Sequence, residues 1–394
     1  MKIALLSLNY LPSTGGLVSY IFNFSKYLVS IGHEVTIICA MEKDWKGNDI
    51  EELNGIRVIR VKVFDFPIWQ ALFTPFHVVK RFSKALRCLI EEYQFDLYIS
   101  RHIYLAKALQ NQVPKSINIF ICPLISPRLI YINSLRENTI RKIYSMLLIP
   151  QLYLIEKSVI RSGCPLFVLS ESKRLEISKF YKVDKEDINV APPGINDEKF
   201  NCNNVFASEK KNNTLRILSV CRIVEEKNLH LVLDAISLLI SENPELVINY
   251  LIVGDGPLRG VIEKKAVDLG LSDILVIKGF VDNPEEFYKK SDIMVLPSKY
   301  EGFGHVYIEA NACGIPVVGL KNGVDGSITA SDEIITEPSN GYLLHENSAE
   351  EIKRVLVDFL KSNKTPEEWR RNCSLHVHKN YSWSNHFEQI TKTL

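Results

Sequence analysis

Short apolar runs alternate with longer amphipathic stretches throughout the first half of the chain. The runs have the length of buried strands, and the stretches between them repeat apolar residues at the helical period. The expected strands are Ile3–Leu8, Glu34–Cys39, Arg57–Val63, Leu97–Ser100, Ile117–Cys122 and Leu166–Leu169. The expected helices include Leu17–Ile31, His77–Tyr93 and Ile140–Arg161. Strands that alternate with helices predict a parallel sheet covered on both faces.

The alternation stops at Ala191-Pro-Pro-Gly-Ile-Asn-Asp, and a polar, Asn-rich stretch typical of a linker follows from Asn201 to Thr214. A second alternation then begins. Its expected strands are Arg216–Val220, Ile248–Val253, Ile274–Lys278, Ile293–Leu296 and Pro316–Leu320, and its helices include Leu229–Ile240, Arg259–Leu269 and Glu350–Lys361. The pattern predicts two α/β domains, residues 1–195 and 196–381, with ligands beyond the carboxyl ends of their strands.

The composition is that of a soluble globular protein, with 46% hydrophobic and 24% charged residues among 394. No apolar run approaches the roughly 18–20 residues that span a bilayer. The segment Met1–Leu8 is too short for a signal peptide and is better interpreted as a first strand. Eight cysteines form no C-x-x-C pair, which favours structural thiols in a reducing compartment over metal ligands or disulfides. We therefore expect a cytoplasmic protein.

Charge is unevenly distributed between the two halves. Residues 1–195 hold 25 Lys and Arg against 17 Asp and Glu, whereas residues 196–394 hold 22 against 29. Between Asp65 and Glu91 there are cations but no acid: Lys80, Arg81, Lys84 and Arg87. They are preceded by or interleaved with apolar residues: Phe66, Ile68, Trp69, Leu72, Phe73, Phe76 and Phe82.

A second basic stretch runs from Arg128 to Arg161, with six cations against Glu137 and Glu156. Basic amphipathic surface in the N-terminal domain fits peripheral binding to an anionic membrane, on the inner face of the cell membrane. An ordinary helical face whose aromatic residues belong to the core is the alternative. Nucleic acid is not expected as a partner, because the basic half has no reader motif and the acidic half would repel a polyanion.

Four glycine-rich or charged turns follow strands and are candidate ligand loops. Gly15-Gly16 precedes a helix whose amides could meet a phosphate. Arg222 and Lys227 project from the loop after the first strand of the second half and could neutralise a diphosphate. Gly254, in Val253-Gly-Asp-Gly-Pro, and Val281, in Gly279-Phe-Val-Asp-Asn, lie in turns that could hold a ligand by backbone contacts. Each of these turns could equally be an ordinary connection.

The strongest candidate is Pro297-Ser-Lys-Tyr-Glu-Gly-Phe-Gly-His-Val-Tyr-Ile-Glu-Ala. A strand ends at Leu296, and a glycine-rich turn leads to a helix that is expected near His305. Glu309 would lie one turn into the helix on the same face as His305. The free amides at the helix start suit a phosphate, while Glu301 and Glu309 would accept hydrogen bonds from sugar and ribose hydroxyls. The arrangement predicts a nucleotide-sugar site.

These residues resemble the signature of the family 4 glycosyltransferases with the GT-B fold. The resemblance rests on Glu301-x7-Glu309 with E-G-F-G and on Gly314-Ile-Pro-Val-Val, and it covers nearly the whole chain. Further matching pieces occur in the family's order: Gly15-Gly16, Gly32-His-Glu-Val35, Pro193-Gly-Ile-Asn196, Arg222 to Lys227, Gly254-Asp-Gly-Pro257 and Asn340-Gly341. The fold implied is two Rossmann-like domains with parallel sheets facing across an interdomain cleft. A terminal helix, about residues 382–394 and including Trp383, would pack back on the first domain.

The resemblance implies a retaining glycosyltransferase of the hexosyltransferase class. It would move a sugar from a UDP- or GDP-sugar to a glycan or lipid-linked acceptor, and bacterial cell-surface polysaccharide or glycolipid synthesis is the expected setting. Glu301 would contact the transferred sugar and Glu309 the ribose, with Arg222, Lys227 and Gly16 at the diphosphate. The remaining donor-binding positions are the amides of Gly302, Phe303, Gly304, His305 and Val306. No metal or other cofactor is expected, since there is no D-x-D and the cations could replace one.

The sequence departs from the family after Ile117–Cys122, where family members often carry a histidine that faces the sugar. Here the chain reads Cys122-Pro-Leu-Ile-Ser-Pro. His102 is the nearest substitute, and it could act in transfer or simply cap a helix. Two other functions stay open: a nucleotide-sugar 2-epimerase of the same fold, and a non-catalytic nucleotide-sugar-binding protein.

Overall fold

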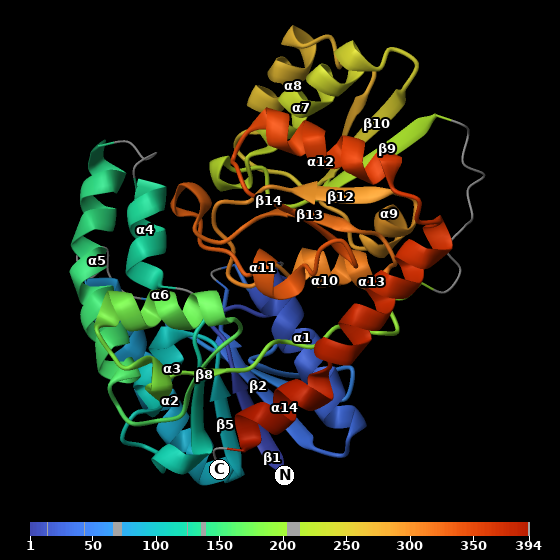
Figure 1. Cartoon of the computed structure of the whole chain (residues 1–394). Helices are drawn as coiled ribbons and strands as arrows, with labels where there is room; N and C mark the ends of the chain where they lie inside the picture. Colours follow the sequence, from blue (N-terminus) through green and yellow to red (C-terminus); the bar gives the residue numbers. More distant parts are fainter. Residues whose placement is uncertain are drawn as a thin grey trace. The chain divides into compact units, whose positions relative to one another are not determined.

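The computed structural model describes all residues except 14, 43, 66–72, 124, 135–138, 203–212 and 393–394. The chain divides into two compact units (Figure 1). Unit 1 contains Met1–Gly194 and Trp383–Leu394, and unit 2 contains Ile195–Ser382. Each is a sheet with helices packed on it. Most of the stretch expected to be a linker, 203–212, lies outside the described residues.

In the described part of unit 1 the strands are β1 (Lys2–Leu6), β2 (Glu34–Ala40), β3 (Ile50–Leu53), β4 (Ile56–Val61), β5 (Leu97–Ser100), β6 (Asn118–Ile121), β7 (Leu166–Val168) and β8 (Asn189–Val190). The helices are α1 (Gly16–Ser30), α2 (Thr74–Tyr93), α3 (Ile103–Leu109), α4 (Ser126–Ser134), α5 (Thr139–Ile160), α6 (Glu171–Tyr181) and α14 (Trp383–Thr391). All six strands and all three helices expected in this half are present, with ends shifted by a few residues.

The sheet of unit 1 has the order β3-β4-β2-β1-β5-β6-β7-β8 and is parallel except at one edge. There β3 pairs antiparallel with β4, across a turn in which Asn54 and Gly55 have φ angles of 55° and 74°. Such Asn-Gly turns match the twist of a two-residue hairpin. The sequence reading omitted β3 because Ile-Glu-Glu-Leu is too polar to stand out as a buried run.

The last helix, α14, belongs to unit 1 although it lies far away in sequence. Trp383 stacks on Phe24 of α1 with ring centroids 5.3 Å apart, and the buried His386 contacts the hydroxyl of Tyr20 at 2.5 Å. His386 also lies 3.1 Å from the carbonyl oxygen of Ala191. These contacts tie the C-terminal end of the chain to α1 through aromatic packing.

Unit 2 has a fully parallel sheet in the order β11-β10-β9-β12-β13-β14 within the described residues. Its strands are β9 (Thr214–Val220), β10 (Val247–Val253), β11 (Leu275–Gly279), β12 (Ile293–Leu296), β13 (Val317–Leu320) and β14 (Gly341–Leu344). Its helices are α7 (Leu229–Glu242), α8 (Arg259–Asp268), α9 (Glu285–Lys289), α10 (His305–Ala312), α11 (Ser331–Ile334), α12 (Ala349–Lys361) and α13 (Pro366–Asn380). Two parallel α/β units confirm the predicted fold class.

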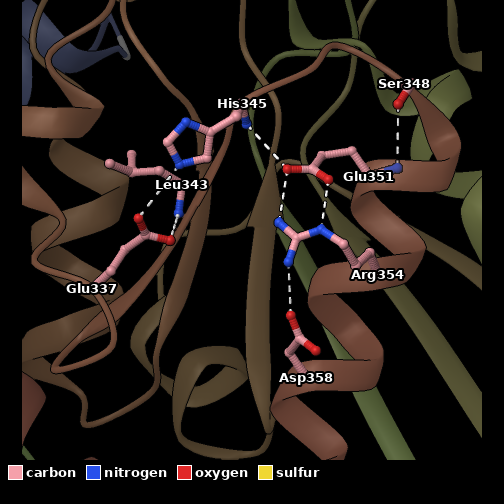
Figure 2. A network of polar contacts seen from close by, with 7 residues as sticks. All are labelled: Glu337, Leu343, His345, Ser348, Glu351, Arg354 and Asp358. Carbon is pink, nitrogen blue, oxygen red and sulfur yellow. Dashed lines mark hydrogen bonds and ion pairs between the residues drawn. The ribbon is translucent and has the colours of Figure 1, made fainter.

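A local charge network fixes the start of α12, which contacts β14 (Figure 2). Ser348 caps the helix by accepting from the amide of Glu351 at 3.2 Å, and Glu351 accepts from the amide of His345 at 3.2 Å. Arg354 donates to both oxygens of Glu351, at 2.7 and 2.8 Å, and to Asp358 at 2.8 Å. The hydrogen bonds from Arg354 lower the pKa of Glu351. This network stabilises the helix start and belongs to the scaffold.

One helix departs from the expectation that no segment approaches membrane-spanning length. Within α5, Lys142–Ile160 is long and apolar enough by length and composition to cross a bilayer, with a mean hydropathy of 1.3. The sequence has no unbroken apolar run of that length, but the mean hydropathy over the helix is high despite its few charged residues. Only 22% of that window is buried. Its buried side, with Ile155 and Val159, packs into the core of unit 1.

Candidate functional site

The loop after β9 lies against the glycine turn after β10. The amide of Ile223 donates to the carbonyl of Asp255 at 2.9 Å. A Cβ atom on Gly254 would come 1.9 Å from the carbonyl oxygen of Cys221, and one on Gly256 would come 2.3 Å from that of Ile223. Glycine is therefore required here by the close approach of two backbones. This packing explains why residue 254 is a glycine. A role of Gly254 in donor binding stays a prediction.

Asn228 joins the same loop to the end of β12. It is buried, adopts a left-handed φ of 52°, and donates through its side chain to the carbonyl of Pro297 at 2.9 Å. The amide of Lys299 donates in turn to the carbonyl of Glu226 at 2.8 Å. These two hydrogen bonds hold the loop around Asn228 against the segment that follows Pro297. Sequence reasoning missed Asn228, since no local pattern marks a residue whose partner is 69 positions away.

The structure brings together two of the predicted site residues, Lys227 and Glu301. The ammonium of Lys227 donates to Oε1 of Glu301, and the hydroxyl of Ser298 donates to the same oxygen at 3.1 Å. Both charged side chains are mostly buried, 13% and 15% exposed. Burial alone would lower the pKa of Lys227, but the charge and the hydrogen bond of Glu301, with smaller contributions from Cys221 and Glu226, together outweigh it, and the pKa is raised. Oε2 of Glu301 has no partner among the described residues, so it is available to a ligand hydroxyl.

Arg222 lies in the same loop as Lys227 but is exposed and makes no ion pair within the described part of the chain. The turn that holds it is closed by the amide of Val224, which donates to the carbonyl of Arg222 at 3.0 Å. The structure therefore holds the backbone of Arg222 and leaves its guanidinium free to meet an anion. Its fork of donors matches phosphate oxygens.

The helix after the E-G-F-G turn begins where the pattern predicted. Gly304 precedes α10 with a φ of 93°, and no side chain caps the helix start. A Cβ on Gly304 would come 2.6 Å from the ring of the buried Tyr307, whose hydroxyl donates to the carbonyl of Leu296 at 2.6 Å. The side chain of Phe303 is buried, so this residue can offer a ligand only its amide. The amides of Gly302 to Val306 thus lie at an uncapped helix start, which favours an anion.

Glu309 lies one turn into α10, four residues after the half-buried His305. The hydroxyl of the fully buried Tyr288 donates to Oε2 of Glu309 at 3.0 Å. Burial raises the pKa of Glu309 to about 7, although the hydrogen bond from Tyr288 acts in the opposite direction. The carboxyl group is therefore close to half protonated at neutral pH. Tyr288, on α9, carried no sequence signal that linked it to this site.

The turn that contains Val281 adjoins the Gly254 turn. The amide of Gly254 donates to the carbonyl of Gly279 at 2.8 Å, and Val281 follows two residues later, half-buried. Lys199 holds the far side of this turn by donating to the carbonyl of Asp282 at 2.7 Å. The two glycine turns therefore form one continuous edge beyond β10 and β11.

Two predicted residues belong to unit 1. Gly16 is the first residue of α1, and a Cβ atom there would meet nothing within 4 Å, so the helix start is open. His102 is the N-cap of α3, and its Nδ1 accepts from the amide of Tyr104 at 3.3 Å. Burial lowers the pKa of His102 to about 4, so the imidazole is neutral at physiological pH. The structure thus shows the capping role, while a role in transfer stays a prediction.

Unit 2 therefore holds three features beyond the carboxyl ends of β9 and β12: two cations in one loop, a carboxylate with a free oxygen, and an uncapped helix start. Among the described residues, no group of three or more His, Cys, Asp and Glu side chains is arranged to hold a metal ion. The groups present can neutralise an anion and accept hydrogen bonds from hydroxyls.

Two family models together match most of the chain. The model of Glycosyltransferase Family 4 matches residues 14–199, and that of Glycosyl transferases group 1 matches residues 202–375. An uncharacterized glycosyltransferase of Methanocaldococcus jannaschii is 27% identical over 98% of this chain and 95% of its own. The alpha-monoglucosyldiacylglycerol synthase of Streptococcus pneumoniae is 26% identical over 82% of this chain and 71% of its own. The Anabaena protein HepE, solved with UDP-glucose, is 16% identical with a TM-score of 0.72, over 100% and 99% of the two chains.

Proposed function

Since the chain is a family 4 glycosyltransferase with the GT-B fold, we propose that it transfers a hexosyl group from a UDP- or GDP-sugar, with retention of anomeric configuration. The acceptor is a glycan or a lipid-linked glycan. The observation that carries the proposal is the contact of Lys227 with Glu301, which joins a diphosphate-neutralising cation to a sugar-binding carboxylate.

The geometry of unit 2 supports the following roles. Arg222 and Lys227 neutralise the negative charge that builds on the departing nucleoside diphosphate, and the amides of Gly302 to Val306 bind its oxygens. Glu301 accepts from a hydroxyl of the transferred sugar through Oε2, while Ser298 and Lys227 hold Oε1. In its ionised form Glu309 accepts from the ribose. With two cations at the leaving group, transfer proceeds without a metal ion.

Relatives support the choice of donor and acceptor. HepE binds UDP-glucose, and the streptococcal relative is named for the synthesis of a glucosyl diacylglycerol. A capsular polysaccharide biosynthesis glycosyltransferase of Staphylococcus aureus is 26% identical over 52% of this chain and 56% of its own. These relatives favour bacterial surface polysaccharide or glycolipid synthesis. The eight free cysteines, half of them buried, favour a reducing, cytoplasmic location.

The decisive experiment is a donor screen by thermal unfolding with UDP, GDP and their sugars. A ligand at about 100 times its dissociation constant adds roughly 2.7 kcal/mol to the folded state. The Lys227→Ala variant should lose that stabilisation, whereas Lys264→Ala, an exposed lysine of α8, should keep it. The absence of any shift with all these ligands would overturn the proposal. With the donor known, the anomeric configuration of the product tests retention, and epimer formed without acceptor would assign a 2-epimerase instead.

A further inference from the structure

The outer face of α5 is apolar along most of its length. Ile143, Met146, Leu147 and Leu154 are 56%, 51%, 48% and 59% exposed, and Pro150 on the same stripe is also exposed. The spacing of 3, 4 and 7 residues puts these side chains on one face of the helix, over about 16 Å. Helices of soluble proteins normally carry polar residues on the face away from the core. This stripe therefore lacks a partner within the described part of the chain.

The opposite face of α5 is committed to the core of unit 1. Leu152, Ile155, Val159 and Ile160 are buried, together with Glu156. Cys122, directly after β6, and Tyr181 on α6 pack in the same cluster. A membrane-spanning helix that stands alone is surrounded by lipid on all sides, but one face of α5 is buried in the protein core. This packing therefore excludes α5 as a lone membrane-spanning helix. Only its exposed stripe is available as a binding surface.

The exposed face of α2 adds positive charge. Phe73 and Phe76, 55% and 44% exposed, begin the face, and Lys80, Lys84 and Arg87 continue it at helical spacing. Its acids, Glu91 and Glu92, come only in the last turn. Phe82 points inward and is fully buried, so this aromatic residue belongs to the core. The residues Phe66, Ile68, Trp69 and Leu72, and Arg136 and Glu137 of the second basic stretch, lie outside the described residues.

The two helices meet near these apolar positions. The hydroxyls of Thr74 on α2 and Tyr144 on α5 lie 3.3 Å apart. Phe73 and Ile143 are the chain neighbours of these two residues, so the apolar face of α2 begins beside the stripe of α5. Lys157, near the end of α5, and Arg161, the residue after that end, follow at the same helical spacing. The surface formed by these two helices therefore has apolar side chains at its centre and cations on both sides.

We propose that this face of unit 1, formed by the α5 stripe and the exposed face of α2, docks on an anionic lipid bilayer. The apolar side chains would enter the boundary between headgroups and acyl chains, and the cations would remain among anionic headgroups. Each cation near such a surface adds to the attraction for anionic headgroups. A second copy of the chain fits less well, because a symmetric contact would bring the same cations together. The inference does not depend on the donor or acceptor proposed above.

Sedimentation of the full chain with vesicles tests the proposal. Vesicles of phosphatidylcholine mixed with phosphatidylglycerol should retain the protein, and pure phosphatidylcholine vesicles should not. The double variant Leu147→Glu/Leu154→Glu should weaken binding by more than about tenfold. The matched control, Val261→Glu/Val267→Glu on α8, introduces the same charges at valines that are 59% and 64% exposed, and should bind normally.

The basic face has its own variant. Lys84→Ser/Arg87→Ser should weaken binding about tenfold or more and reduce its dependence on salt, because two headgroup contacts are lost. Lys264→Ser/Lys361→Ser in unit 2 is the control of equal charge change. Thermal unfolding of every variant separates lost binding from lost folding. Equal binding of the wild type to neutral and anionic vesicles would overturn the proposal. It would also be overturned if the wild type bound no vesicles and formed a dimer that the α5 substitutions dissociate.

Discussion

The carboxyl ends of the strands are used differently in the two units. In unit 2, Lys227 and Glu301 pair across two loops, and Arg222 stays exposed in the same loop as Lys227. In unit 1, Arg101 is 2% exposed, rests on the ring of Tyr20 at 4.1 Å, and meets no carboxylate among the described residues. Glu156 is buried as well, with a pKa that burial raises to about 7. Similar sheets thus place charge toward a ligand in one unit and inside the scaffold in the other.

The difference has a physical origin. A ligand site needs charged groups that are held in place and still have an atom free to contact the ligand. Oε2 of Glu301 is such an atom. A buried charge must instead be satisfied from within, as Glu156 is by the hydroxyl of Tyr181 at 2.8 Å and the amide of Ser126 at 3.1 Å. Substitutions that remove the charge of Glu301 should therefore affect activity, and those that remove the charge of Glu156 should affect stability.

The largest effect is expected from Glu301→Gln. The substitution removes the charge opposite Lys227 and replaces one of the two carboxylate oxygens with an amide NH2 group, so the transfer rate should fall about 100- to 1000-fold. Initial rates with the donor identified by the screen measure it. Glu351→Gln, in the network of Figure 2, is the control in the same unit and should retain the rate. A normal rate for Glu301→Gln would remove this residue from the catalytic site.

Glycine substitutions separate packing from ligand access. Gly254→Ala should destabilise the fold by about 2–4 kcal/mol, because its Cβ would lie 1.9 Å from the carbonyl oxygen of Cys221. Gly16→Ala meets open space and should leave stability within about 1 kcal/mol while weakening nucleotide binding. Chemical unfolding and nucleotide titration of both variants check this. Equal stability of the two variants would contradict the close approach.

Glu156→Gln tests the buried carboxyl of unit 1. Its pKa is raised from 4.5 to about 7 by burial, so the folded state favours the protonated form. Stability is therefore lost as pH rises from about 4.5 through 7. Glutamine keeps an acceptor for Tyr181 and does not ionise, so at pH 8 the variant should be about 1–3 kcal/mol more stable than the wild type. Unfolding at several pH values measures the slope, and an unchanged slope would refute the assignment.

Glu309 should couple nucleotide binding to pH. Ribose hydroxyls donate to the ionised carboxylate, and the pKa of the free site is raised to about 7. Affinity for the nucleotide should then fall by up to about tenfold between pH 7 and 6, with proton release on binding at neutral pH. Calorimetry in buffers of different ionisation enthalpy detects that proton. In Glu309→Gln both the pH dependence and the proton should vanish.

Glu351 should give the smallest effect, with the opposite sign to Glu156. Hydrogen bonds from Arg354 lower its pKa, so the stabilisation is present above the ordinary pKa and is lost as pH falls. Because the side chain of Arg354 is 52% exposed, Glu351→Gln should cost less than about 1 kcal/mol at neutral pH. High salt should shrink this difference. A larger loss at pH 4 than at pH 7 would contradict the direction of the shift.

Much of the fold was predictable from local pattern. The strands of both units and the start of α10 near His305 follow from apolar periods and glycine turns, which depend on neighbours in sequence. The short antiparallel β3 was missed, and so was β14, because four-residue runs that begin with glycine or carry paired acids lack a clear period. The exposed stripe of α5 could not be read either, since both faces of that helix are apolar.

The sequence by itself determined the two α/β alternations and the E-G-F-G turn, and it predicts Arg222, Lys227, Glu301 and Glu309 as a donor-binding set. Only the tertiary structure decided that Asn228 clamps two loops, that Lys227 meets Glu301 across 74 residues, and that His102 caps a helix. It also decided which face of α5 remains uncovered. Local periods arise from bonds between near neighbours, whereas burial and charge pairing depend on which distant segments the packed sheets bring together.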